Sequence, residues 1–125
     1  MAKHYKNGRS TGDGRHIRIP HVIMDTEAYL SLLPPARVVL QELLKAYNGS
    51  NNGKLGLSVR RAAERSCISK DSAARAFQAL EDAGFIEMTT KGSFRLKNRH
   101  ASEWRITWLK CDLTGALPTR KYRTT

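Results

Sequence analysis

The clearest repeat of hydrophobic positions lies between residues 36 and 47. Apolar side chains recur there at i, i+1, i+4, i+5 and i+8, namely Val39, Leu40, Leu43, Leu44 and Tyr47. This spacing places them on one face of a helix, so we predict an amphipathic helix over 36–47. Pro35 suits the first turn of that helix, where its missing N–H is harmless, and the loop 48–53, which reads Asn-Gly-Ser-Asn-Asn-Gly, ends it.

Shorter elements are expected on both sides of this helix. Residues 16–20 alternate between polar and apolar and predict a short edge strand that stops at Pro20. Residues 25–27 read Asp-Thr-Glu and predict a capped short helix over 28–30. A short strand is predicted over 55–57.

Residues 58–84 predict two helices joined by a very short turn. Ser58 caps the first and Ser69 caps the second, and Gly84 occupies the position after the second helix where a left-handed residue is common. The inward positions are Val59, Ala62 and Ala63 in the first helix, and Ala73, Ala76, Phe77 and Leu80 in the second. Only residues 66–68 separate the helices, so they must cross steeply, as in a helix-turn-helix.

The pattern then changes to alternation. Residues 85–88 predict a strand, 90–93 a hairpin turn and 94–97 a returning strand, and residues 104–108 predict a third strand. Burial is the simplest account of the large apolar residues in this half of the chain, so we assign a structural role to Phe77, Leu80, Phe85, Ile86, Trp104 and Ile106.

Charge gives the first indication of a partner. The chain carries 22 Lys and Arg against 11 Asp and Glu, a net charge of +11 in 125 residues, with basic residues at both ends. A balance of this kind favours a polyanion such as nucleic acid. No apolar run is long enough to span a bilayer, so we expect a cytoplasmic, nucleoid-associated protein without a membrane partner, and its two cysteines are expected to be reduced.

The second helix of the pair presents side chains suited to DNA. Arg75 can pair with guanine, Gln78 with adenine, and the methyl group of Ala74 can touch thymine, while hydroxyl and ammonium groups hold phosphates. The complete set of predicted DNA-binding residues is Arg60, Arg61, Ser69, Lys70, Ser72, Ala74, Arg75, Gln78, Lys91, Arg95 and Lys97. No acid, base or metal-ligand constellation is visible, so we expect neither an enzyme nor a cofactor or metal.

Residues 68–86 read Ile-Ser-Lys-Asp-Ser-Ala-Ala-Arg-Ala-Phe-Gln-Ala-Leu-Glu-Asp-Ala-Gly-Phe-Ile. This string resembles the recognition helix and first wing strand of winged-helix regulators of the MarR and GntR type. It also resembles small helix-turn-helix proteins of bacterial phages, plasmids and other mobile elements. The resemblance implies a wing that reaches DNA through Lys91, Arg95 and Lys97. One departure is Cys67, which holds a turn position usually occupied by glycine.

These patterns predict an α+β winged helix-turn-helix with a three-helix core, a β-hairpin wing and basic flexible arms. We place a flexible basic arm at 1–15, the domain at 16–112 with the helix-turn-helix at 58–84 and the wing at 85–109, and a basic C-terminal tail at 113–125. The expected function is sequence-specific binding of double-stranded DNA by a homodimeric transcriptional regulator of a bacterial or mobile-element system. The alternatives are a replication or recombination accessory protein that binds repeated sites and recruits a protein partner, and a winged helix that contacts only protein.

Overall fold

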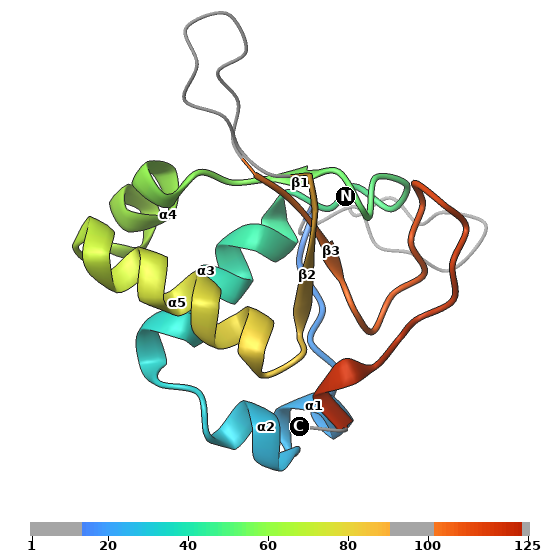
Figure 1. The fold of residues 1–125 in the computed structure, drawn as a ribbon, viewed down its shortest axis with the longest axis horizontal. Helices are drawn as coiled ribbons and strands as arrows, with labels where there is room; N and C mark the ends of the chain where they lie inside the picture. Colours follow the sequence, from blue (N-terminus) through green and yellow to red (C-terminus); the bar gives the residue numbers. More distant parts are fainter. Residues whose placement is uncertain (1–13, 91–101, 124–125) are drawn as a thin grey trace, which may run out of the picture.

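A computed structural model of the chain describes residues 14–90 and 102–123 (Figure 1). The helices are α1 (His21–Met24), α2 (Glu27–Leu30), α3 (Pro34–Lys45), α4 (Val59–Ser66) and α5 (Lys70–Asp82), with a 3-10 helix η1 (Lys121–Arg123). The strands are β1 (Leu55–Gly56), β2 (Ile86–Thr90) and β3 (Glu103–Ile106). The described part of the chain is therefore α+β, as predicted, with a small antiparallel sheet.

Hydroxyl caps begin three of the helices. The side chains of Thr26, Ser58 and Ser69 each accept a hydrogen bond from the backbone N–H three residues later, on Tyr29, Arg61 and Ser72 at 3.0–3.2 Å. Such a bond satisfies one of the N–H groups that a helix start leaves without an intrahelical acceptor. The predicted caps Ser58 and Ser69 are confirmed, and the long helix begins at Pro34, two residues before its predicted start.

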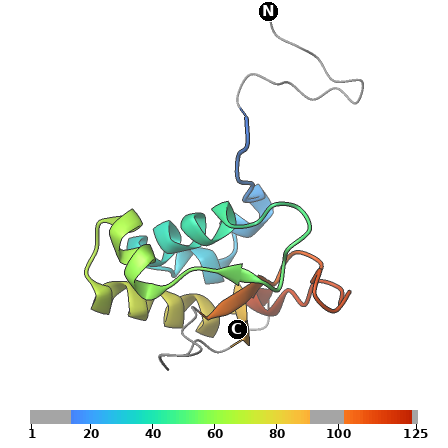
Figure 2. The same cartoon turned by 90° about the horizontal axis from the view of Figure 1, so that it is seen from above.

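The three strands form one sheet in the order β1-β3-β2, and both pairings are antiparallel. Ile86 lies opposite Ile106, and Leu55 lies opposite Trp104. The strand paired with β2 is thus β3, the predicted third strand, while the predicted return strand 94–97 lies outside the described residues. Seen from above, α3, α4 and α5 lie together on one side of the sheet (Figure 2).

Aromatic rings join the helices to the sheet. Phe85 is fully buried, stacks on Tyr122 at 5.2 Å between centroids, and meets Tyr29 and Trp108 edge to face. Phe77 stacks on Trp104 at 5.4 Å. The six residues assigned a structural role are all buried, which confirms the assignment. Val59 is an exception among the inward predictions, because it is 38% exposed at the first position of α4.

The C-terminal segment differs from the predicted basic tail. The Arg120 N–H donates to the Thr107 carbonyl at 3.0 Å, and Tyr122 is buried, so residues 120–122 dock against the domain. Gly84 makes this possible: a Cβ atom there would lie 2.6 Å from the backbone of Lys121 and Tyr122. Part of the positive charge assigned to a free tail is also neutralised, since Lys121 pairs with Glu87.

The predicted edge strand over residues 16–20 is absent from the structure. Pro20 is instead the N-cap residue of α1, with its carbonyl accepting from the N–H groups of Ile23 and Met24. Ile17 and Ile19 are partly buried and pack against the core. The alternation of apolar and polar residues over 16–20 therefore reflects an extended segment that packs on the domain without pairing as a β-strand.

Candidate nucleic-acid interface

The turn between α4 and α5 consists of a left-handed residue and one apolar side chain. Cys67 has φ 57° and ψ 44°, and the N–H groups of Cys67 and Ile68 both donate to the Ala63 carbonyl. Ile68, which follows Cys67 in the turn, is partly buried and packs against the core. Cys67 therefore adopts the backbone conformation for which glycine is usually selected, at a cost of about 1 kcal/mol or more.

Small side chains let the two helices approach. Ala62 and Ala63 of α4 and Ala73 and Ala76 of α5 are all buried. Fixed by this contact and by the Ser69 cap, the first two turns of α5 point their remaining side chains outward.

Four predicted DNA-binding residues come together at the start of α5. The Ser69 hydroxyl donates to Ser72 Oγ at 3.0 Å, and Arg75 Nη2 donates to the same Oγ at 3.3 Å. Lys70 is exposed beside them and Ala74 is exposed on the next turn. Hydroxyl, ammonium and guanidinium donors thus share one solvent-facing surface, next to the N–H groups of a helix start, which favour anions.

Gln78 stands apart from this group. Its side-chain amide donates to Asp82 Oδ1 at 2.9 Å, and Glu81 lies on the same last turns of the helix. Since a carboxylate repels phosphate, the second half of α5 is a poorer surface for DNA than the first half. The predicted reading surface extends as far as Gln78, and the structure shows that Gln78 belongs with the acidic end of the helix rather than with Arg75.

The arginines of α4 are exposed but already paired. Arg60 and Arg61 lie 3.4 and 3.8 Å from the carboxylate of Glu64, and Arg65 lies 3.0 Å from that of Glu42 on α3. The two exposed pairs with Glu64 contribute at most about 1 kcal/mol each, so a phosphate can replace Glu64 there, whereas Glu42, the partner of Arg65, is only 16% exposed.

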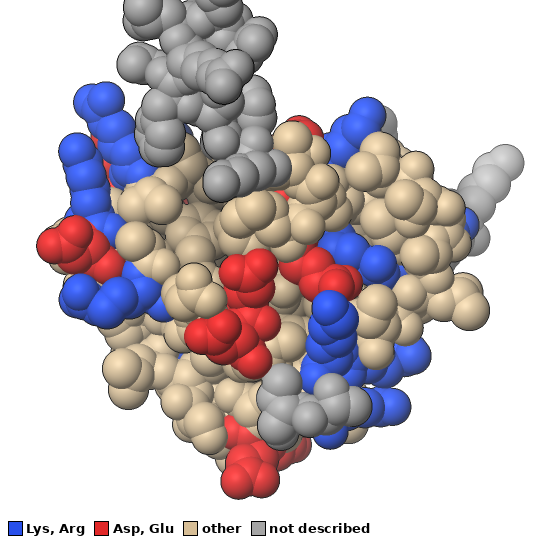
Figure 3. All heavy atoms as spheres, in the orientation of Figure 1, with Lys and Arg blue, Asp and Glu red and all other residues tan. Residues whose placement is uncertain are grey.

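Charge separates along one face of the molecule. Figure 3 shows blue Lys and Arg atoms over α4 and the start of α5, interrupted by one red cluster, and a larger red cluster over the end of α5. Three further predicted contacts, Lys91, Arg95 and Lys97, lie outside the described residues.

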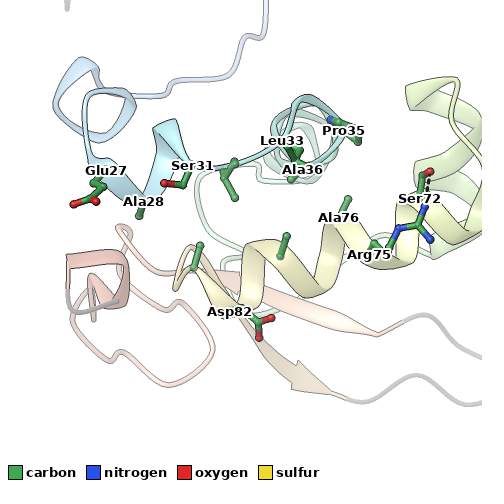
Figure 4. A pocket seen from close by; sticks show the side chains of 13 residues that line it. Glu27, Ala28, Ser31, Leu33, Pro35, Ala36, Ser72, Arg75, Ala76 and Asp82 are labelled. Carbon is green, nitrogen blue, oxygen red and sulfur yellow. Dashed lines mark hydrogen bonds between the residues drawn. The ribbon is translucent and has the colours of Figure 1, made fainter.

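A groove that the sequence analysis did not foresee runs beside α5. It has a volume of about 610 Å³ and lies between α5 on one side and α2 and the start of α3 on the other (Figure 4). Ser72 and Arg75 line one end, and Asp82 and Glu27 line the other. Between them the lining is mostly apolar, from Leu32, Leu33, Ala36, Ala76 and Ala79.

Two titratable groups with shifted pKa values lie away from this surface. Burial, together with the carboxylate of Asp112, raises the pKa of Tyr47. Burial alone would raise the pKa of the Cys111 thiol, but hydrogen bonds to Thr114 and Leu113 and the charge of Arg105 outweigh it and lower the pKa. Neither group belongs to the candidate interface.

The chain matches no protein-family model, no curated protein and no solved structure. None of the helices within 14–90 and 102–123 is long and apolar enough to cross a membrane.

Proposed function

We propose that the α4–α5 pair is the helix-turn-helix of a winged-helix domain that binds double-stranded DNA. The observation that carries the proposal is the cluster at the start of α5, where Ser69, Lys70, Ser72 and Arg75 share one exposed surface next to a capped helix start. In known helix-turn-helix complexes, the first residues of the second helix contact base edges in the major groove.

Each residue has a distinct role in this proposal. Arg75 reads guanine through two parallel hydrogen bonds, after giving up its bond to Ser72. Ser69, Ser72 and Lys70 hold phosphates, and Arg60 and Arg61 add phosphate contacts by exchanging their Glu64 partner. Base readout by Gln78 requires it to leave Asp82 first, so we assign it a smaller contribution.

The net charge supports the same proposal. The chain carries +11 overall, whereas the end of α5 is acidic, so the acidic end orients the helix with its first turns toward the duplex. We place the function in transcriptional regulation, and the sequence arrangement of the bound sites tests that finer assignment.

The experiment measures binding of labelled random-sequence and selected duplexes by fluorescence anisotropy. If six to ten phosphates are contacted, the affinity falls by about three to five orders of magnitude between roughly 50 and 200 mM salt. Arg75→Ala is expected to cost about 1–3 kcal/mol on the selected sequence and much less on random DNA. The control Lys110→Ala removes one exposed positive charge on the loop after β3, outside the α4–α5 pair, and is expected to leave sequence preference unchanged.

A salt-independent affinity, or an unchanged preference after Arg75→Ala, would contradict the proposal. Sequencing of the bound fragments then separates the roles. Inverted repeats near promoters support a regulator, and tandem direct repeats support a replication or recombination accessory protein.

A further inference from the structure

The exposed face of α5 carries Arg75, Gln78 and Asp82 in one stripe. All three residues are exposed, and Gln78 and Asp82 follow Arg75 by three and seven positions. At 3.6 residues per turn, this spacing keeps them within about 60° of one another around the helix axis. With a rise of about 1.5 Å per residue, Gln78 lies about 4.5 Å and Asp82 about 10 Å beyond Arg75 along that axis. A duplex that meets Arg75 and lies along α5 would therefore also meet Gln78 and Asp82.

The side-chain amide of Gln78 lies against an unneutralised carboxylate. Gln78 Nε2 donates to Asp82 Oδ1 at 2.9 Å. Within residues 14–90 and 102–123, Asp82 has no Lys or Arg partner, so its negative charge stays uncompensated. Glutamine recognises adenine by donating to N7 and accepting from the N6 amino group. An adenine on Gln78 would therefore bring its N7 lone pair to the same nitrogen that faces the Asp82 carboxylate.

Helix stability does not account for a carboxylate at this position. Asp82 is the last residue of α5, and the last turn contains no basic residue. A negative side chain at the C-terminal end of a helix meets the negative end of the helix dipole, which is unfavourable. The exposed hydrogen bond to Gln78, four positions earlier, stabilises the helix only slightly. The reason for this charge therefore lies in what approaches the exposed face of α5.

We propose that Asp82 is a specificity-determining residue, which keeps Gln78 out of base readout and confines recognition to the first two turns of α5. This inference rests on the proposed function. The carboxylate acts through its charge, because it repels phosphates and the acceptor atoms N7 and O6 that purines present in the major groove. Unfavourable contacts contribute to specificity alongside favourable ones. The target is then a duplex with a guanine read by Arg75 and without an adenine requirement at the position that Gln78 faces.

Neutralising Asp82 tests this role directly. Asp82→Asn removes the charge but keeps an oxygen that can accept from Gln78, so it separates the effect of the charge from that of the hydrogen bond. Sequences are selected from random duplexes and their affinities measured by fluorescence anisotropy. Asp82→Asn is expected to gain a preference for adenine of at least about fivefold at one position, while the guanine preference due to Arg75 is retained.

Two further variants identify the source of the new preference. Gln78→Ala in the Asp82→Asn background is expected to abolish the adenine preference and to leave the guanine preference. Asp25→Asn is the matched control, because it removes an exposed carboxylate at the C-terminal end of α1, and it is expected to create no new preference.

The inference is overturned if the wild type already prefers adenine through Gln78, if Asp82→Asn gains no adenine preference, or if the gained preference survives Gln78→Ala. Retention of the guanine preference in Asp82→Asn also shows that this variant is folded. A guanine preference that depends on Arg75, without any effect of Asp82→Asn, would refute this inference alone. A wild type whose binding is salt-independent, or whose preference survives Arg75→Ala, would refute the proposed function itself.

Discussion

Replacing Cys67 with glycine is expected to stabilise the protein. Cys67 is exposed and sits at φ 57°, so its side chain contributes little packing while its Cβ makes the left-handed backbone unfavourable. Relief of that strain is worth about 1–2 kcal/mol. Glycine also has more conformational freedom in the unfolded chain, which lowers the stability by about 0.5–1 kcal/mol. The net gain in stability is therefore about 0.5–1 kcal/mol.

Urea unfolding followed by circular dichroism measures the gain as a higher midpoint at unchanged slope. For a chain of this size, the corresponding rise in Tm is about 2–4 °C. Cys67→Ala is the matched control, because it removes the thiol but keeps the Cβ, and it is expected to leave stability nearly unchanged.

Two results would refute this reasoning. Equal stability of the glycine and alanine variants would show that the turn carries no backbone strain. A destabilised glycine variant would show that the Cys67 side chain makes contacts that its exposure does not suggest.

Three further changes probe the rest of the fold. Asn52→Ala is expected to lower the free energy of unfolding in urea by about 2–4 kcal/mol. The buried Asn52 amide donates to the carbonyls of Ile106 and Lys110 and accepts from the Ile106 N–H. Unchanged stability would contradict that role. Gly84→Ala is expected to cost a similar amount, through an unfavourable φ of +84° and a clash with the C-terminal backbone, and to increase protease cleavage near the C-terminus. The raised pKa of Tyr47 means that the folded protein favours the neutral phenol. The contribution of Tyr47 to folding stability is therefore present below pH 10 and is lost as the pH rises through the higher pKa of the folded state. Tyr47→Phe is expected to remove the part of the stability loss at alkaline pH that Tyr47 causes. Tyrosinate absorbance measures the titration directly.

Local signals in the sequence determined where α4 and α5 begin and where α5 ends. Ser58 and Ser69 begin α4 and α5 because a hydroxyl can accept a backbone N–H three residues on, and Gly84 follows α5 with the positive φ that glycine tolerates. The spacing of apolar residues in α3 and α5 predicted their buried faces for a similar local reason, since helical geometry repeats every 3.6 residues. The cluster around Arg75 was predictable because its members lie within two turns of one helix.

The partners of distant segments were decided only by tertiary structure. The pairing of β2 with residues 103–106, the return of Tyr122 to Phe85 and the groove between α2 and α5 all join positions far apart in the chain. Tyr122 looked like part of a basic tail because its flanking residues are charged and its stacking partner lies 37 positions earlier. Sequence patterns report which face of a segment prefers burial, whereas the choice of covering segment depends on shape and contact in three dimensions.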